Sequence, residues 1–282
     1  MSKQAQFFIV PTPIGNLDDI TFRSVSLLRE VDFILAEDTR HSKILLQHYQ
    51  ITTPMISLHD HNELDRVDKI IGYLSDGKTL ALISDAGTPL ISDPGFKLVR
   101  ALREKGFSVS PLPGACAAIA ALSASGLPTD RFLFAGFLPA KQSQRQTKLD
   151  ELKATPETIV LYESPRRILD LLSDIAKVMG DDRDVCLAKE LTKQFETIIV
   201  MPVGELINEI NANANLLKGE MVVLIKGCDK PPTEKLEVEV NALLIELLSE
   251  CKLKQAVKLA ANITSLNKNH LYELALKLKP QV

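Results

Sequence analysis

Short apolar runs rich in β-branched and aromatic residues alternate with amphipathic stretches along the first part of the chain. Such runs predict β-strands, and they end near Val10, Glu37, His59, Ser84 and Pro113. Between the runs, apolar residues recur every three or four positions over residues 64–74 and 96–102, which predicts helices. Strands that alternate with helices are typical of a mostly parallel sheet. We therefore predict an N-terminal α/β lobe over residues 1–125.

A second set of strand patterns begins after residue 125. The runs are FLFAGFLP, TIVLYES, DVCLAKE, FETIIVM and EMVVLIKG. Only a short polar connection separates DVCLAKE from FETIIVM, and short connections join antiparallel rather than parallel neighbours. We therefore predict a second α/β lobe over residues 126–228 that contains antiparallel pairs.

The last part of the chain has only helical patterns. DKPPTEKLEVE, with its prolines and alternating charges, predicts a linker, and an all-helical module follows over residues 238–282. Helical stripes in this module flank NITSLNKN, a pattern that resembles a helix-turn-helix. Residues 251–282 contain six lysines and one glutamate, a local charge of +5. This charge suits contact with RNA, although a merely solubilising surface would have it too.

Composition narrows the class of protein. The chain of 282 residues is 45% hydrophobic, which is enough for sizeable cores, and 33 Lys and Arg oppose 36 Asp and Glu. This balance argues against binding nucleic acid through overall charge, so any RNA contact must use local patches. The four cysteines lie far apart without a CxxC pair, which favours reduced thiols. The chain shows neither an apolar run of membrane length nor a signal-peptide core, so we expect a cytoplasmic protein without membrane contact.

Three segments rich in Gly and Pro follow predicted strands, where open α/β sheets bind ligands. VPTPIGNLDDIT (residues 10–21) matches neither the dinucleotide fingerprint nor the P-loop, and an ordinary turn capped by an aspartate is the alternative. SDAGTPLISDPG (residues 84–95) exceeds the usual loop length of about 2–6 residues, and its alternative is a stiff connection with Asp93 as helix N-cap. PLPGACAAIAAL (residues 111–122) would present free helix amides to a ligand, or form an Ala-rich core helix.

Polar clusters at other predicted strand ends supply candidate catalytic groups. AEDTR (residues 36–40) places two acids and an arginine together, although a surface ion network is the alternative. ESPRR and AKELTK allow the same two interpretations. LHDHNE (residues 58–63) contains two histidines without a third ligand nearby, so we expect a polar cluster there and predict no metal.

Together these segments resemble a known family. PTPIGNLDDIT, AEDTRHS, SDAGTPLISDPG, PLPGACAAIAALSASGLPTDRFLFAGFLP and KELTKQFE are similar, in order, to motifs of the S-adenosylmethionine-dependent tetrapyrrole methylase superfamily. The resemblance covers about residues 5–228 and is strongest to members that methylate the ribose 2'-hydroxyl of a cytidine in the decoding region of 16S ribosomal RNA. It implies two α/β lobes with S-adenosyl-L-methionine in the cleft between them, a homodimer, and ribosomal RNA of the small ribosomal subunit as partner. The helical tail is similar to an extra C-terminal domain of those members.

The resemblance also implies a set of cofactor-binding residues. They are Pro13, Gly15, Asp85, Ala86, Gly87, Ile91, Ala115, Cys116, Tyr162, Glu220 and Met221. Ala115 and Cys116 depart from the family pattern, in which many relatives carry Thr and Ser. A donor at those positions would then be a backbone amide or a water. The physical chemistry agrees, since a sulfonium cation suits a nearby acid and an adenine suits apolar walls.

Methyl transfer to a ribose hydroxyl benefits from a group that takes the proton and from cations that hold phosphate. Of the acids Glu37, Asp38, Glu163 and Glu190, we expect Asp38 or Glu190 to act on the hydroxyl, with Arg40 beside Asp38 and Lys189 as an alternative base. The residues expected to bind RNA are Lys141, Arg145, Arg166, Arg167, Lys193, Lys252 and Lys254. Two alternatives are a methylase of a tetrapyrrole precursor and a non-catalytic RNA-binding ribosome-assembly factor.

Overall fold

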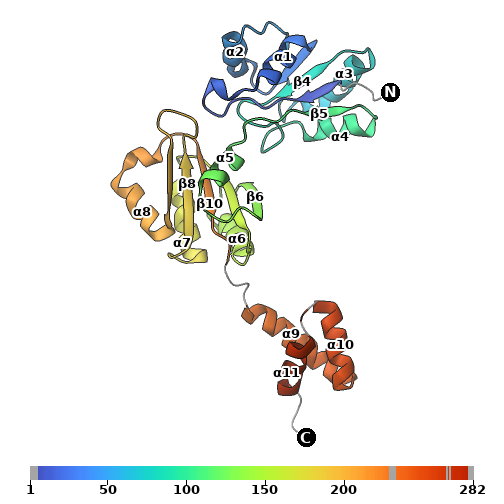
Figure 1. The fold of residues 1–282 in the computed structure, drawn as a ribbon, viewed down its shortest axis with the longest axis vertical. Coiled ribbons are helices and arrows are strands. Elements are labelled where there is room, and N and C mark those ends of the chain that lie inside the picture. Colours follow the sequence, from blue (N-terminus) through green and yellow to red (C-terminus); the bar gives the residue numbers. More distant parts are fainter. Residues whose placement is uncertain (1–5, 229–232, 265, 267, 279–282) are drawn as a thin grey trace. The chain divides into compact units, whose positions relative to one another are not determined.

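The computed structural model describes residues 6–228, 233–264, 266 and 268–278. The chain forms two compact units. The first contains residues up to 153 together with 157–227, and the second contains residues 154–156 and those from 228 onward. Both β-sheets belong to the first unit, and the last three helices belong to the second (Figure 1).

The first sheet has five parallel strands in the order β3-β2-β4-β1-β5. The strands are β1 (Phe7–Ile9), β2 (Phe33–Ala36), β3 (Met55–Ser57), β4 (Leu80–Ile83) and β5 (Val109–Pro111). The helices are η1 (Leu17–Asp19), α1 (Phe22–Glu30), α2 (Thr39–His48), α3 (Glu63–Ser75), α4 (Phe96–Glu104) and α5 (Ala117–Ala124). Every strand lies inside the apolar run that predicted it, and α3 and α4 cover the two predicted helical stretches.

Apolar side chains cover both faces of this sheet, as a parallel sheet requires. Leu28 and Leu46 of α1 and α2 pack on one face, and Ile70 and Leu98 of α3 and α4 pack on the other. Strands β2 and β4 end level with each other, because Ala36 pairs with Ile83. The loops that follow these strands therefore meet at one edge of the sheet, where such folds place ligands.

The second sheet is mixed, in the order β6-β7-β10-β8-β9. Its strands are β6 (Phe132–Phe137), β7 (Thr158–Glu163), β8 (Asp184–Lys189), β9 (Thr197–Pro202) and β10 (Met221–Ile225), and its helices are α6 (Gln142–Leu152), α7 (Ile168–Met179), α8 (Val203–Ala212) and η2 (Ala214–Leu217). Strands β8 and β9 pair antiparallel, as do β10 with β7 and β8, whereas β6 pairs parallel to β7. The antiparallel pair predicted from KELTKQFETIIVM is confirmed.

Alternating residues of the second sheet face two different layers. On one face, Leu187 of β8 packs with residues of α6, α7 and α8, such as Leu149. On the other face, Cys186 and Ala188 pack with Ala121 and its neighbours in α5. The two faces thus separate a helical layer from the side on which α5 and the loops of the first sheet lie.

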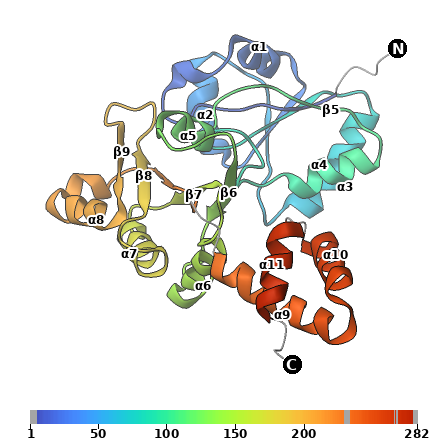
Figure 2. The ribbon, with the colours of Figure 1, turned by 60° about the horizontal axis from the view of Figure 1, so that its bottom comes forward.

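The second unit contains three helices that pack on one another (Figure 2): α9 (Thr233–Glu250), α10 (Leu253–Thr264) and α11 (Lys268–Leu278). Val240, Leu244, Val257 and Leu271 form its core. The predicted linker DKPPTEKLEVE is wrong in its second half, because α9 already begins at Thr233. Glu and Lys are strong helix formers, and they dominate that half. The linker residues 229–232, positions 265 and 267 of the predicted turn, and Lys279 of the basic tail lie outside the described residues.

Within the described part of the chain, no helix combines the length and the apolar character that a membrane crossing needs.

Candidate active site

A cavity of about 440 Å³, here called the interlobe pocket, lies between loops of the first sheet and strands of the second. The first sheet contributes the loops after β1, β2 and β4, and α5 contributes its start. The lining residues from this side are Ile14, Glu37, Asp85, Ala86, Gly87, Thr88, Ile91, Ser92, Asp93, Cys116 and Ala117. The second sheet contributes Phe137, Tyr162, Glu163, Ser164, Pro165, Ala188, Leu191, Glu220, Met221 and Val222. The volume lies in the range of about 300–1,000 Å³ that is typical of small-molecule sites.

The loop after β4 is held in an unusual backbone conformation. Gly87 has φ +83°, as expected for a glycine chosen for its conformational freedom, and it forms two backbone hydrogen bonds with Thr12 at 2.9 and 3.0 Å. The Ser84 hydroxyl donates to the Gly87 carbonyl at 3.1 Å. Leu90 and Ser92 also have positive φ, 73° and 70°. Non-glycine residues in this region are rare and concentrate at ligand sites, so the loop geometry favours a binding role.

Three carboxylates gather on the first-lobe side of the interlobe pocket. Burial, together with the negative charges of Asp85, Asp93, Asp60 and Asp38, raises the pKa of Glu37 to about 7. Burial also raises the pKa of Asp93 to about 6, helped by Asp85 and Asp60. The Asp85 carboxylate accepts a hydrogen bond from the Asp38 amide at 3.1 Å. A positive ligand would relieve the repulsion among these acids.

Tyr162 connects the second sheet to α5. Its hydroxyl accepts a hydrogen bond from the Ala118 amide at 3.2 Å, and its ring contacts Phe134 and Phe137 edge-on, with centroids 5.1 and 5.7 Å away. Burial raises the pKa of Tyr162 to about 12, so its hydroxyl stays protonated at neutral pH. Tyr162 therefore satisfies one free amide at the start of α5 and gives the pocket an aromatic wall.

A second cavity of about 260 Å³, here called the α2 pocket, shares a wall with the interlobe pocket. Ile14, Asp85, Ala86 and Glu220 line both cavities. The remaining lining residues are Thr12, Pro13, Gly15, Leu17, His41, Ser42, Ile44, Leu45, Ser84 and Lys193.

Most of the expected cofactor residues meet in one place. Asp85, Ala86, Gly87, Ile91, Cys116, Tyr162, Glu220 and Met221 line the interlobe pocket. Pro13 and Gly15 line the α2 pocket instead. The Ala115 carbonyl accepts a hydrogen bond from the Thr88 hydroxyl at 2.9 Å, which ties the α5 segment to the loop after β4. Asp93 and Glu163 also line the interlobe pocket, although neither was among the expected cofactor-binding residues. Asp93 lies in the Gly- and Pro-rich segment SDAGTPLISDPG, and Glu163 was a candidate acid of the second lobe.

The expected catalytic residues do not meet in either pocket. The Asp38 carboxylate caps α2 by accepting from the Arg40 amide at 2.8 Å, and it pairs with the Arg40 side chain at 3.2 Å. The hydrogen bond from the Arg40 side chain holds the pKa of Asp38 below its ordinary value. The Glu190 carboxylate accepts from Lys193 and from the Glu220 amide, both at 2.9 Å. Asp38 and Glu190 thus have structural partners and line neither cavity.

Lys189 lies on the wrong face of its strand for the expected role. Its neighbour Ala188 lines the interlobe pocket, and successive strand residues point to opposite faces. Lys189 is buried on the side of α8 and η2, where its ammonium donates to the Asn215 carbonyl at 3.1 Å. Lys189 therefore does not line the interlobe pocket, and its position gives no support to the expectation that it acts as a base there.

Two of the expected RNA-binding arginines have partners within the fold. Arg145 is buried, and its Nε pairs with Asp174 at 2.6 Å with both side chains almost inaccessible. Arg167 pairs with buried Glu163 and donates to the Leu138 carbonyl at 2.7 Å, so its guanidinium serves the fold. Lys193 is half-buried and paired with two carboxylates.

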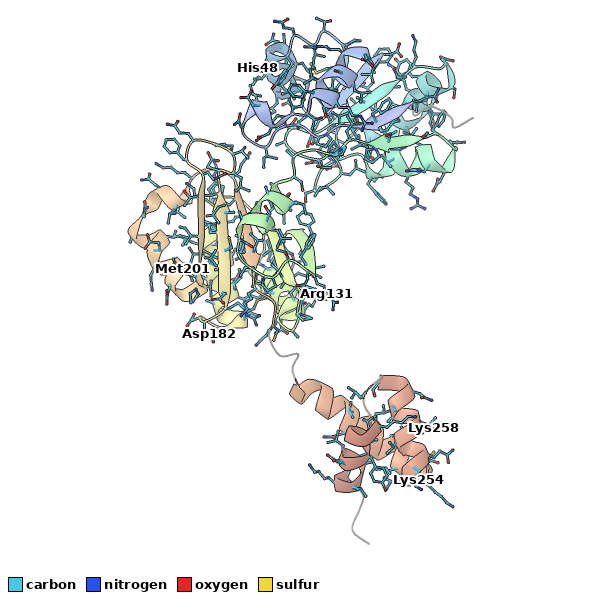
Figure 3. All side chains as sticks on the ribbon, viewed as in Figure 1. His48, Arg131, Asp182, Met201, Lys254 and Lys258 are labelled. Carbon is cyan, nitrogen blue, oxygen red and sulfur yellow. The ribbon has the colours of Figure 1, made fainter. Side chains whose placement is uncertain are left out.

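The other expected RNA-binding residues are exposed. Lys141 and Arg166 lie on the surface of the first unit. Lys252 and Lys254 are exposed in the second unit, and Figure 3 shows Lys254 and Lys258 projecting outward from α10. These positions leave the charges free to meet phosphate, as a local RNA-binding patch requires.

The histidine-containing segment LHDHNE has a structural role in the described chain. Asn62 accepts a hydrogen bond from the His59 amide at 2.9 Å, and buried Glu63 accepts from the Leu98 amide at 2.8 Å. Glu63 therefore caps α4, whose own N-cap Gly95 has no side chain to do so. Among the residues that the structure describes, no cluster of three His, Cys, Asp or Glu could hold a metal ion.

Residues 6–207 match the family model for Tetrapyrrole (Corrin/Porphyrin) Methylases. The chain belongs to the tetrapyrrole methylase family. Residues 234–279 match a second model, the RsmI C-terminal HTH domain. The family resemblance and the fold of two α/β lobes with a helical C-terminal domain, both inferred from the motifs, are confirmed.

Relatives within the tetrapyrrole methylase family are similar over nearly the whole chain. The chain is 51% identical over 276 residues to "Ribosomal RNA small subunit methyltransferase I" of Escherichia coli O157:H7, covering 98% of this chain and 96% of the relative. It is 50% identical over 271 residues to the protein of the same name from Pseudomonas aeruginosa, covering 96% of each.

Solved structures of the family share the fold at low identity. The methyltransferase CobJ superposes with a TM-score of 0.60 at 18% identity, covering 80% of this chain and 95% of its own. Uroporphyrin-III C-methyl transferase from Thermus thermophilus, complexed with S-adenyl homocysteine, gives 0.54 at 14% identity, covering 79% and 97%.

Proposed function

We propose that this chain is an S-adenosylmethionine-dependent methyltransferase that methylates the ribose 2'-hydroxyl of a cytidine in the decoding region of 16S ribosomal RNA. The near-full-length similarity to relatives named ribosomal RNA small subunit methyltransferase I carries this proposal. The fold alone leaves the acceptor open, because structural neighbours include enzymes of porphyrin chemistry. We further propose a homodimer in the cytoplasm that acts on the small ribosomal subunit.

The interlobe pocket fits S-adenosylmethionine, which supplies a methyl group attached to a sulfonium cation. Glu37, Asp85 and Asp93 provide negative charge for its cationic groups, since opposite charges attract most strongly where water is excluded. Apolar residues of the second lobe, such as Leu191 and Met221, provide walls for the adenine.

Asp85 is well placed to act on the acceptor hydroxyl, because it lines both cavities. A carboxylate there can accept a hydrogen bond from the hydroxyl and orient its oxygen toward the methyl donor. In-line displacement depends mainly on such positioning. We therefore propose Asp85, in place of Asp38, Glu190 or Lys189, as the carboxylate that orients the hydroxyl.

Methyl transfer to three acceptors, compared side by side, tests the proposal. Labelled S-adenosylmethionine would be offered with free 16S ribosomal RNA, assembled small subunits and a porphyrinoid, followed by mapping of the ribose methyl group. We expect label in the RNA of one of the first two acceptors, on a cytidine 2'-oxygen. Label in the porphyrinoid would favour the tetrapyrrole alternative. Cofactor binding without transfer to any acceptor would favour the assembly factor.

A further inference from the structure

The α2 pocket has a position that cofactor binding alone does not explain. It adjoins the interlobe pocket, because Ile14, Asp85, Ala86 and Glu220 line both cavities. In a group transfer, the acceptor atom has to approach the donor closely and in line. A second cavity that opens on the same wall is therefore the place from which an acceptor can reach the methyl group.

The walls of the α2 pocket combine apolar and polar groups. Helix α2 contributes Ile44 and Leu45 as apolar surface and His41 as a ring that can stack or form hydrogen bonds. Ser42 also lines the pocket, and its buried hydroxyl has no hydrogen-bond partner within the described structure. A buried polar atom without a partner is uncommon and calls for an explanation. Rotation of the Ser42 side chain toward a bound ligand would supply the missing partner.

The lining of the α2 pocket also includes a positive group that is held by two ion pairs. Lys193 donates to Glu190 at 2.9 Å and to Glu220 at 3.0 Å, so its ammonium is held in place at the pocket. Outside the pocket, Arg40 and Lys43 are exposed on α2 beside His41. A polar pocket with exposed basic residues on the same helix suits a nucleotide whose neighbouring phosphates remain outside.

We infer that the α2 pocket receives the target nucleoside of the RNA, with its 2'-hydroxyl at the wall formed by Asp85 and Ala86. Its volume of about 260 Å³ is smaller than the typical range of about 300–1,000 Å³ for drug-sized ligands, which suits one nucleoside better than a tetrapyrrole macrocycle. The nucleoside must leave its base stack to enter, as targets of base-modifying enzymes do. This inference rests on the proposed function.

Filling the pocket with a larger side chain tests the inference. Ile44 is 60% exposed and lines the pocket, so Ile44→Trp would occupy its volume without disturbing the core. Gln47→Trp is the matched control, because Gln47 is exposed on the same helix but does not line the pocket. Steady-state methylation of whichever acceptor the wild type uses would be measured for the full chain, with cofactor affinity measured by calorimetry.

We expect Ile44→Trp to raise KM for RNA or lower kcat/KM by about tenfold or more while leaving cofactor affinity unchanged, since it blocks only the acceptor. Gln47→Trp should match the wild type. Equal behaviour of the two variants, whether both active or both impaired, would overturn the inference but leave the proposed function intact. A wild-type chain that methylates no ribosomal RNA would overturn the proposed function first, and the inference with it.

A covalent readout gives a second, independent measurement. RNA that carries a photoreactive pyrimidine at the target position should cross-link to the peptide containing His41 and Ile44 in the wild-type chain. Cross-linking confined to the second unit or to the surface of α6 would place the nucleoside elsewhere and overturn the inference.

Discussion

Gly87→Ala should weaken cofactor binding, whereas the same substitution at a glycine of similar backbone strain outside the interlobe pocket should not. At φ +83°, an L-residue costs about 1–2 kcal/mol relative to glycine. A Cβ at this position would also lie 3.3 Å from Ile14 Cγ2 and 3.7 Å from the Ala115 carbonyl, so the wall of the interlobe pocket must shift. We expect the fold to lose about 1–2 kcal/mol, or about 2–4 °C in Tm for each kcal/mol.

Gly77→Ala is the matched control for this experiment. Gly77 has φ +80°, nearly the same backbone strain, but an added Cβ would meet no atom within 4 Å. Calorimetry with S-adenosylmethionine should show at least a tenfold weaker Kd for Gly87→Ala, about 1.4 kcal/mol, and no change for Gly77→Ala. Denaturant unfolding should show similar losses for both. Unchanged cofactor affinity in Gly87→Ala would refute the placement of the ligand beside this loop.

Three further predictions concern charge. Because Glu37 has a pKa of about 7, its carboxyl group is mostly neutral below that pH and negative above it. The affinity for the cationic cofactor should therefore rise from about pH 6 to about pH 8. In a calorimetric pH series, Glu37→Gln should show a smaller rise than the wild type. Arg145→Ala should cost about 3–5 kcal/mol of unfolding free energy, because it leaves the buried Asp174 carboxylate without its ion-pair partner. Lys148→Ala on the same helix should change the free energy of unfolding in urea by less than about 0.5 kcal/mol. Equal losses would contradict the structural role of the Arg145–Asp174 ion pair. Truncation before Thr233 should weaken RNA binding and reduce its salt dependence while sparing cofactor affinity; parallel loss of both would mean that the helical unit supports the fold.

Local sequence patterns predicted the strands well, because the burial of a strand determines which of its positions are apolar, and the length of a connection indicates whether neighbouring strands are parallel. The run around Leu80–Ile83 is buried on both faces and reads as continuous apolar sequence. The positive φ at Gly87 was also predictable, since glycine among Asp and Pro marks a special turn.

Side-chain partners were harder to predict, because they depend on what the fold brings near. Arg145 looked like part of a basic surface in KQSQRQTK, yet it shares a helical face with Leu149 and Leu152, and that spacing was available from the sequence. Strand alternation predicts that Lys189 and Ala188 point to opposite faces of the sheet, but the sequence does not say which of the two faces lines the pocket. The raised pKa of Glu37 arises from burial and from acids on two other segments, residues 58–63 and 84–95, so no local pattern contains it.

Gly15 and Lys193 lie far apart in sequence but pack closely in the fold. Substitutions in the loop after β1 are therefore constrained by the connection between β8 and β9. A Cβ on Gly15 would lie 2.5 Å from Lys193 Cγ and 2.8 Å from the Leu191 carbonyl. A shorter residue at position 193 would relieve only the first overlap, because the second involves backbone. The loop after β1 and the connection between β8 and β9 are therefore expected to diverge in step during descent. A chimaera that takes one of them from a distant relative should need the other from the same parent.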